Sequence, residues 1–395
     1  MMSKREVVVV GGARTAFTKF GGSFRDISAI DLSVYALKEA LKRANVSPEQ
    51  VDHVVFGNVL QTSPDALMFA RMVGLKTGIP KEVPALTVNR VCGTGIEAIV
   101  TGARLILTGE ADVVATGGGE NMSQIPHVIR GARWGTPLFE TIQAKDYLWE
   151  ALYDPYGEVY MADTAENLAI QYKLSREEVD AHAYESHRRA LEAIKKGYLQ
   201  EEIVPITVKD GKTERVVDVD EHPRKTSLEE LAKLKPRFRE NGVVTAGNAS
   251  GINDGAAALI LTSLEYAEKH GLKPLARLVS WGVAGVEPKI MGIGPVPAIR
   301  KALEKANLTL DDMALIEINE AFSAQYLACQ KELGFDPAIG NVNGGAVALG
   351  HPLAASGARL SLTLIHELHR RKERFGVASL CIGGGQGIAA VWERL

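Results

Sequence analysis

The spacing of apolar positions predicts alternating strands and helices in the first part of the chain. The apolar run Val7–Val10 indicates a buried strand, and apolar residues at spacings of three and four between Ile30 and Ala44 indicate an amphipathic helix. A second strand is predicted at Val54–Phe56. A third is predicted at residues 111–119, and its last three residues are glycines. Strands that alternate with amphipathic helices imply a parallel or mixed sheet covered by helices, an α/β fold.

The pattern changes after this region and later returns. Between residues 122 and 248 the chain is more polar and rich in charged helices, one of which is predicted to start at the capping box Ser175–Glu178. A buried-strand pattern returns at Ala256–Leu261. We therefore expect three parts: residues 1–121 with 249–270 as a first core half, residues 122–248 as an inserted lobe, and residues 271–395 as a second core half.

The last third of the chain repeats the first. Four pairs of segments match in the same order: Glu39–Ser47 with Lys301–Thr309, Val54–Phe56 with Ile316–Ile318, Gly102–Leu105 with Gly357–Leu360, and Gly117–Gly119 with Gly383–Gly385. In this alignment Cys381 corresponds to Ala115. Four ordered matches indicate a duplicated unit whose halves pack as a pseudo-dimer. Ligands bind such sheets at the carboxyl ends of the strands.

Cys92 is the first candidate for chemistry. It follows the strand-like segment Ala85–Val88 and precedes an apolar helix pattern that runs to Leu107. A cysteine at a strand-to-helix turn lies near free backbone N–H groups and the positive end of the helix dipole, which favours the thiolate. Gly93 and Gly95 would let a substrate approach the backbone. The alternative is a buried structural cysteine.

Three further polar or thiol groups fall at strand ends or helix starts of the second half. They are Asn319, His351 and Cys381. Taken alone, a histidine before a proline is more often structural, and a cysteine at a strand end usually belongs to the core. Because loops at equivalent strand ends converge in space, we expect these groups to meet Cys92.

Composition excludes several other classes of protein. A net charge of −3 gives no reason to expect nucleic acid or an anionic membrane as partner. The three cysteines are widely spaced and form no zinc motif, so we expect no metal and a reducing compartment, the cytoplasm. No stretch suggests a signal peptide or approaches a membrane span. Gly11–Arg14 lacks the spacing of a dinucleotide or phosphate loop.

Taken together, the motifs resemble those of the thiolase family, and the likeness covers essentially the whole chain. The matching segments are Arg14–Phe17, Asn89–Gly95, Glu120–Ser123, Thr164–Asn167, Thr245–Gly251, Asn319–Phe322, Gly344–Pro352 and Cys381–Gly385. The resemblance implies a five-layered αβαβα duplication with a loop domain inserted in the first half.

The resemblance also implies a role for each reactive group. Cys92 would accept the acyl group, and His351 would take its proton. The backbone N–H groups of Cys92 and Gly383 would form the oxyanion hole for that step. Cys381 would then remove the α-proton of a second acyl-CoA. His351 and a water held by Asn319 would form a second oxyanion hole for the resulting enolate.

Coenzyme A is expected as substrate and product, with no separate cofactor, and the inserted lobe is expected to bind it. By resemblance, the contacts are Tyr160, Met161, Arg224, Phe238, Ala246, Ser250, Ile252 and Phe322. The cationic run from Arg224 to Arg237 has an alternative interpretation as the solvated face of a helix.

Some positions depart from the family pattern. Tyr160 stands where short-chain biosynthetic members carry His, and Ala162 stands where Gly is usual, which leaves the acyl length open. Ala354 replaces the usual Gly in the segment after His351, and Gly119 stands where Met is frequent. The resemblance therefore predicts an acetyl-CoA acetyltransferase or a longer-chain 3-ketoacyl-CoA thiolase.

Other functions fit the sequence less well. β-Ketoacyl synthases and hydroxymethylglutaryl-CoA synthases lack a second cysteine base, and a cysteine hydrolase would not need Cys381. A non-catalytic acyl-CoA or lipid carrier would have lost at least one reactive group. The family is usually dimeric or tetrameric, and the apolar residues Ile125, Pro126 and Trp134 suggest an interface.

Overall fold

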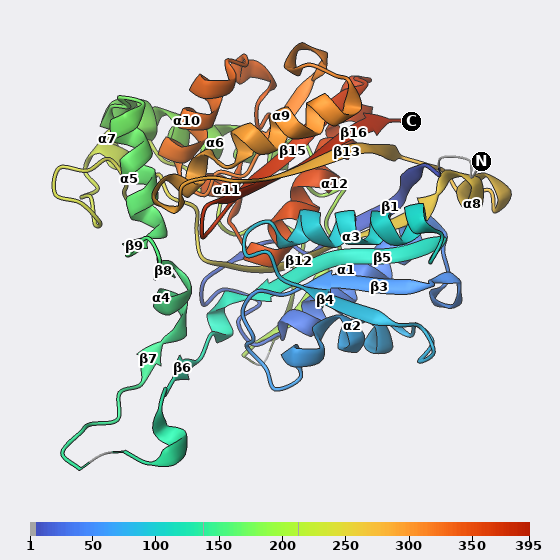
Figure 1. Ribbon diagram of the computed structural model, residues 1–395, viewed down its shortest axis with the longest axis horizontal. Helices are drawn as coiled ribbons and strands as arrows, with labels where there is room; N and C mark the ends of the chain where they lie inside the picture. Colours follow the sequence, from blue (N-terminus) through green and yellow to red (C-terminus); the bar gives the residue numbers. More distant parts are fainter. Residues whose placement is uncertain (1–4, 137, 212) are drawn as a thin grey trace.

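Two half-sheets joined edge to edge form the centre of the protein (Figure 1). The computed structural model describes residues 5–136, 138–211 and 213–395. The strands of the main sheet are β1 (Val7–Arg14), β2 (Thr18–Lys19), β3 (His53–Gly57), β4 (Ala85–Val88), β5 (Val113–Asn121), β12 (Asn253–Ser263), β13 (Ala276–Gly285), β14 (Leu315–Ile318), β15 (Phe375–Ile382) and β16 (Gln386–Arg394). The first half-sheet has the order β4-β3-β5-β12-β1, and the second has the order β14-β15-β16-β13.

The two half-sheets repeat the same pairing. β12 runs antiparallel to β1 and β5, and β5 runs parallel to β3. In the second half, β16 runs antiparallel to β13 and β15, and β15 runs parallel to β14. The register shifts at equivalent points, between Val9 and Gly11 and between Leu278 and Ser280. β1 and β13 join the halves through two antiparallel residue pairs.

Helices complete five layers, as the family resemblance implies. The helices of the core are α1 (Ala29–Ala44), α2 (Phe69–Thr77), α3 (Thr94–Thr108), α8 (Leu264–Lys269), α9 (Pro295–Ala306), α10 (Ser323–Leu333), α11 (Ala346–Leu349) and α12 (Leu353–Arg371). α1 and α2 cover the outer face of the first half-sheet. α3 and α12 lie between the half-sheets, and α9 and α10 cover the second (Figure 1).

The predicted repeat is confirmed at its first two segments. α1 and α9 both end at an asparagine in the left-handed conformation, Asn45 and Asn307. In each half a 3-10 turn opened by a capping box follows, at Pro48–Gln50 and at Leu310–Asp312. The next strands, β3 and β14, occupy the same place in their half-sheets. The shared caps show why these segments have similar sequences.

The other two matches are misaligned. Equivalent ladders place Cys381 at the position of Gly119, and not of Ala115. The two glycine runs differ in purpose, because Gly117–Gly119 lie within β5, whereas Gly383–Gly385 form the turn between β15 and β16.

The predicted match between Gly102–Leu105 and Gly357–Leu360 is also wrong, because these segments do not occupy equivalent places in α3 and α12. α3 and α12 cross where Gly95 meets Gly357, since a Cβ on Gly95 would lie 2.9 Å from the Gly357 nitrogen. Gly95, and not Gly102, is therefore the counterpart of Gly357. The repeated letters of Gly102–Leu105 and Gly357–Leu360 do not mark equivalent positions.

The segment between β5 and β12 is built from short elements. They are β6 (His127–Val128), β7 (Lys145–Asp146), α4 (Tyr147–Ala151), β8 (Tyr153–Asp154), β9 (Val159–Tyr160), α5 (Met161–Gln171), α6 (Arg176–Lys195), β10 (Ile206–Asp210), β11 (Thr213–Val217) and α7 (Leu228–Ala232). The predicted capping box at Ser175 and Glu178 is confirmed at the start of α6. Residues 126–136 and 138–146, called the arm below, project from the body as a hairpin-like extension (Figure 1).

Single 3-10 turns connect several of these elements. Besides the two already named, they are Ala66–Met68, Met122–Gln124, Ala132–Trp134, Pro288–Ile293 and Pro337–Ile339. Contrary to the expectation from the sequence, one stretch of the described residues, Val91–Thr108, is long and apolar enough to cross a membrane. It is 61% buried inside the protein and contains α3, so its composition is that of a core helix.

Candidate active site

A strained turn holds Cys92 between β4 and α3. Val91 has a φ of +46°, a left-handed conformation that a β-branched residue rarely adopts. The Thr94 hydroxyl accepts a hydrogen bond from the Arg90 N–H at 2.8 Å and donates one to the Val91 carbonyl at 2.6 Å. Such strain persists only when the surroundings fix it, and it is frequent at functional sites. The turn presents Cys92 directly before the first turn of α3.

The glycines that follow Cys92 serve packing between the halves. A Cβ on Gly93 would lie 2.6 Å from the Ile382 side chain, and a Cβ on Gly95 would lie 2.5 Å from the backbone nitrogen of Ala358. Both neighbours belong to the second half. The expectation that these glycines let a substrate approach is therefore wrong, because their open sides are filled by β15 and α12.

Cys92 is buried, and backbone N–H groups from both halves meet at its sulfur. The N–H groups of Gly383 and of Cys92 itself both act on the sulfur in the direction that favours its thiolate. Burial outweighs them, with a smaller contribution from the nearby Glu120 carboxylate, and raises the pKa of the Cys92 thiol to about 11. The prediction of a thiolate at Cys92 is therefore wrong, although the backbone N–H groups act in the predicted direction. Cys92 is a thiol at neutral pH, so it needs a base.

His351 has the protonation state of a base. Its Nδ1 lies 2.6 Å from the Ser356 hydroxyl oxygen, and that hydroxyl donates to the Pro352 carbonyl at 3.0 Å. The single hydroxyl proton is thus engaged, so Nδ1 carries the hydrogen and Nε2 is left to accept. Burial, reinforced by the Arg359 charge, lowers the pKa of His351 to about 3. The imidazole is neutral at physiological pH.

Asn319 lies beside His351. It follows β14 directly, and its backbone N–H continues the ladder by donating to the Ser379 carbonyl at 2.9 Å. Its Nδ2 is 3.4 Å from His351 Nε2. Its Oδ1 is buried and accepts no hydrogen bond from any residue that the structure describes. A buried orphan acceptor suits a site that receives a water or a substrate.

Cys381 is fully buried near the carboxyl end of β15, close to Cys92. It packs against Met291 and Ala321, with Met161 and Phe322 alongside. Burial raises the pKa of its thiol well above the ordinary value, and the nearby Cys92 raises it further. Two neighbouring thiolates repel each other, so the two cysteines cannot both be ionised in the resting site.

The predicted CoA contacts fall into three groups. Met161 and Phe322 pack near Cys381, and Ile252 packs in the cluster that contains Cys92. Tyr160 and Phe238 line a cavity of about 780 Å³ in the inserted segment, together with Lys145, Asp146, Trp149, Glu150, Tyr153, Asp163 and Arg237. The residues near the two cysteines and the residues that line the cavity are connected through the chain, because Tyr160 of the cavity directly precedes Met161.

The third group lies at the surface of the inserted segment. The backbone N–H of Ser250 donates to the Ala321 carbonyl at 2.9 Å, and Ala246 is exposed. The Arg224 side chain lies 3.4 Å from His222 Nε2. The alternative interpretation was that the cationic run from Arg224 to Arg237 is the solvated face of a helix. It is wrong, because the helix within this run, α7, covers only Leu228–Ala232 and contains no Lys or Arg.

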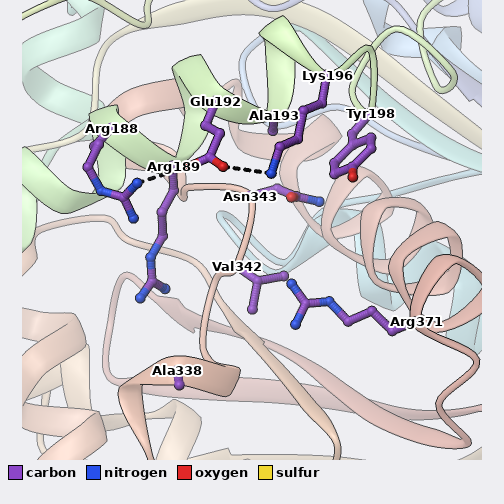
Figure 2. A pocket seen from close by; sticks show the side chains of 10 residues that line it. All are labelled: Arg188, Arg189, Glu192, Ala193, Lys196, Tyr198, Ala338, Val342, Asn343 and Arg371. Atoms are coloured by element: carbon purple, nitrogen blue, oxygen red, sulfur yellow. Dashed lines mark hydrogen bonds and ion pairs between the residues drawn. The ribbon is translucent and has the colours of Figure 1, made fainter.

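Another cavity, of about 280 Å³, lies apart from these residues (Figure 2). It separates α6 from residues 338–343 and the end of α12, and it contains none of the predicted site residues. Its cations are engaged by neighbours, since Arg188 and Lys196 pair with Glu192, and Arg371 pairs with Glu367. This cavity therefore marks where α6 packs against the second half.

Sequence reasoning missed two residues that hold the site together. Ser356 orients His351, and its signal was a hydroxyl in the first turns of the helix after the histidine. Asn253, in β12, accepts the His351 backbone N–H at 3.0 Å, and no local pattern identifies it.

Comparisons with known proteins give the same assignment along the whole chain. Residues 7–265 match the model of the thiolase N-terminal domain, and residues 272–394 match that of the thiolase C-terminal domain. The chain is 53% identical to the mitochondrial 3-ketoacyl-CoA thiolase of Homo sapiens over 98% of both chains.

Solved structures agree in fold. The human mitochondrial 3-ketoacyl-CoA thiolase in complex with CoA superposes with a TM-score of 0.97 at 52% identity, covering 99% of this chain and 98% of that one. The acetyl-CoA acetyltransferase of Bacillus anthracis gives a TM-score of 0.97 at 48% identity over 100% of both chains. The chain therefore belongs to the thiolase family, and it is an acyltransferase of that family.

Proposed function

We propose that this thiolase catalyses the reversible condensation of two acetyl-CoA molecules to acetoacetyl-CoA and CoA, through an acyl group on Cys92. The observation that carries the proposal is that the end of β15, in the second half, packs against the Cys92 turn of the first: a Cβ on Gly93 would lie 2.6 Å from the side chain of Ile382, the residue before Gly383. An acyl-transfer site requires a nucleophile and an oxyanion donor at the same place, and here the two come from different halves. The names of the relatives support the same chemistry.

The first half-reaction loads Cys92. Neutral His351 takes the thiol proton, and the sulfur attacks the thioester carbonyl of acyl-CoA. The N–H groups of Cys92 and Gly383 then hold the oxyanion. Cys381 gives its proton to the sulfur of the departing CoA, which leaves as the free thiol. Cys381 becomes a thiolate at the stage when the acylated Cys92 no longer carries a charge that would oppose it.

The second half-reaction forms the carbon–carbon bond. The Cys381 thiolate removes an α-proton from a second acetyl-CoA, whose enolate oxygen is held by His351 and a water bound to Asn319. The enolate carbon attacks the acyl group on Cys92 and releases its sulfur, which takes back the proton that His351 has held since the first half-reaction. The orphan Oδ1 of Asn319 supports this water. Read in reverse, the same steps cleave a 3-oxoacyl-CoA.

A longer-chain 3-ketoacyl-CoA thiolase is the second candidate. The cavity beside Met161, lined by Tyr160, Trp149 and Phe238, offers an aromatic surface for a longer acyl chain or for the pantetheine arm. The human relative carries this activity in its name. The two candidates share one mechanism and differ in acyl length.

We also propose a division of labour along the chain. Residues 122–248 bind CoA, and the first core half (1–121 with 249–270) and the second (271–395) carry out the chemistry. The steps assigned to Cys92, His351, Asn319 and Cys381 use thiols, an imidazole and a water, so they call for no metal ion or prosthetic group, with CoA as substrate and product. The solved CoA complex of a relative supports CoA as the ligand.

A thiolysis assay with free CoA tests the substrate. We expect loss of acetoacetyl-CoA, measured by the absorbance of its magnesium enolate. Activity confined to acetoacetyl-CoA would support the acetyltransferase, and activity that rises towards 3-oxo-octanoyl-CoA would support the longer-chain enzyme. No activity on either substrate would overturn the proposal and favour a carrier.

A Cys381→Ser variant tests the division between the two cysteines. We expect it to take an acyl group from acetyl-CoA more slowly, because a serine hydroxyl is a weaker acid towards the departing CoA, and to form no acetoacetyl-CoA. The acyl group is seen as a mass increase on the peptide that contains Cys92. If labelled acetyl-CoA left no adduct, the assignment of nucleophile and base would be wrong.

We further propose that the enzyme assembles as a dimer or a tetramer. Within the described residues β4 pairs only with β3, and its Leu86 is 44% exposed. The free edge of a sheet is a template for pairing with a second copy. The arm carries Trp134, which is 92% exposed, and suits a second contact. Sedimentation of the Trp134→Glu variant tests this, because loss of a tetramer alone would assign the arm to dimer–dimer contact.

The compartment is a further proposal. The three cysteines are free thiols, which suits a reducing compartment such as the cytoplasm. The human relative is named as mitochondrial. Cell fractionation distinguishes the two locations.

A further inference from the structure

Glu120 is a buried carboxylate that the steps above do not use. It lies at the end of β5, in the segment Glu120–Ser123 that sequence analysis singled out, and it is fully buried. Its oxygens accept hydrogen bonds from the Asn58 amide at 2.8 Å and from the Leu60 N–H at 2.9 Å, both in the loop after β3. They also accept one from the N–H of Ala354, in the second half, at 3.1 Å.

The bond to Ala354 supplies a helix cap from the other half. Ala354 lies in the first turn of α12, where N–H groups have no partner within the helix. The N-cap residue is Pro352, whose side chain offers no acceptor. A carboxylate at this end also interacts favourably with the helix dipole. Glu120 therefore fixes the start of α12 from a strand of the first half.

The same helix start carries His351. The histidine comes directly before Pro352, and its ring is held by Ser356, in the next turn of α12. A shift of the first turn would move the imidazole relative to Cys92, which is attached to the first half. The path from Glu120 to His351 thus runs through one hydrogen bond and one helical turn.

Burying this carboxylate is costly. Burial raises the pKa of Glu120 to about 7, although the N–H groups of Leu60, Ala354 and Val59 oppose the rise. Among the residues that the structure describes, no cation lies within ion-pair distance of it. Buried charges without a cationic partner are rare and are usually kept for a specific purpose.

We propose that Glu120 is a positioning residue, which sets the start of α12 and thereby holds His351 in place to deprotonate Cys92. The proposal rests on the proposed role of His351 as base. It assigns Glu120 no contact with substrate, and it predicts that the effect of Glu120 passes through His351.

A double-mutant cycle on the full-length enzyme tests this path. The rate of Cys92 acylation by acetyl-CoA is measured in single turnovers for Glu120→Gln, His351→Ala and the double variant. We expect Glu120→Gln to slow acylation about 100-fold, the effect of a misplacement of about 1 Å, with little change in KM. In the His351→Ala background we expect no further loss, because the base that Glu120 positions is gone.

The outcomes separate this inference from the proposed function. An equal loss from Glu120→Gln in both backgrounds would overturn the positioning role and leave the mechanism intact. If His351→Ala alone acylated normally, the proposed mechanism would fail instead. Glu120→Asp covers the case in which Glu120→Gln does not fold, because it keeps the charge but shortens the reach. We expect it to slow acylation as well, and a normal rate would overturn the inference.

Asp254 provides a matched control. It is a buried carboxylate on the neighbouring strand β12, and it accepts hydrogen bonds from the Ser123 N–H at 2.9 Å and the Ser123 hydroxyl at 2.6 Å, without reaching α12. We expect Asp254→Asn to acylate close to the unsubstituted rate. A loss as large as that of Glu120→Gln would mean that any buried carboxylate here has the same effect, which would also overturn the inference.

Discussion

The starts of α3 and α12 occupy equivalent places in the two halves, yet they do different chemistry. Each carries a hydroxyl near its first turn. That of Thr94 binds the backbone on either side of the turn before Cys92, and that of Ser356 binds the imidazole of His351. In the first half the hydroxyl makes a strained turn rigid, and in the second it orients a base. The duplication kept the support and changed the reactive group.

Burial shifts the pKa values of the two groups, Cys92 and His351, in opposite directions. Burial raises the pKa of Cys92 to about 11 and lowers that of His351 to about 3, so both groups are neutral across the physiological range. Neither half is reactive alone, because a neutral thiol needs the base of the other half. The site is therefore a property of how α3 and α12 face each other.

Removing the proposed nucleophile, Cys92, should abolish acyl-enzyme formation. We expect Cys92→Ala to form no acyl-enzyme and to lose at least about 10⁴-fold in kcat, as enzymes that lose a nucleophile do. Turnover and the mass of the acylated protein measure the effect. Cys329→Ala is the control, because Cys329 is also buried but donates to the Gly292 carbonyl in the outer core. Near-normal turnover by Cys92→Ala would contradict the mechanism.

Removing a polar group of the second half separates the two half-reactions. Asn319→Ala deletes the amide 3.4 Å from His351 and the orphan oxygen proposed to hold a water. We expect the carbon–carbon step to lose about 2–4 kcal/mol, the value of an oxyanion-hole element, and acylation to lose less. Single-turnover acylation and steady-state condensation measure the two losses. Equal losses in both would count against a role in the enolate step.

The crossing of α3 and α12 is the third point to test. A Cβ on Gly95 would lie 2.5 Å from the Ala358 nitrogen and 2.8 Å from the Ala354 carbonyl oxygen, both backbone atoms. We expect Gly95→Ala to destabilise the fold by about 1–3 kcal/mol, the usual cost of overpacking. Urea unfolding measures it. Gly285→Ala is the control, because the nearest atom to its Cβ would be 3.9 Å away. If both variants had the same stability, the close crossing would be wrong.

The pH dependence of stability is the smallest expected effect. The unfolded chain protonates His351 near pH 6.5 and the folded chain near pH 3, so the unfolded state binds more protons between these values. The free energy of unfolding contributed by this group therefore falls as the pH falls through that window, by about 1.4 kcal/mol per unit.

The test is a difference between variants. The raised pKa values of Glu120 and Glu317, about 7 and about 8, act in the opposite direction, so the total slope mixes both signs. His351→Asn should remove only its own share, measured by urea unfolding between pH 6.5 and pH 5. An unchanged slope would mean that the histidine is not buried in neutral form.

The helices and strands of the core could be predicted from the sequence because their signals are local, and the family resemblance added the layered arrangement and the candidate reactive groups. Caps such as Asn45, Asn307 and the box at Ser175 act within one turn, so they can be read without the fold. The candidate site was predicted from where Cys92 and His351 stand relative to strand and helix patterns, and from the family resemblance. These signals need no knowledge of distant contacts.

What could not be predicted depends on contacts between halves. The thiolate expected at Cys92 was wrong, because sequence shows a helix start but not the burial around the sulfur. The alignment of Cys381 was wrong, because a glycine run looks the same in a strand and in a turn. Glu120 matched a family motif, but its bond to Ala354 appears only when the two halves are assembled.

The candidate site takes residues from both halves of the chain, and this has a consequence for its formation during synthesis. Cys92 is synthesised early, and the Gly383 N–H that meets its sulfur comes only after the inserted lobe and most of the second half. Domains generally fold in order during synthesis. Until Gly383, in the turn after β15, has emerged from the ribosome, Cys92 lacks the second donor of its proposed oxyanion hole, so the proposed acyl-transfer site of a nascent chain is incomplete. The order of the chain thus delays acyl transfer until the fold is complete.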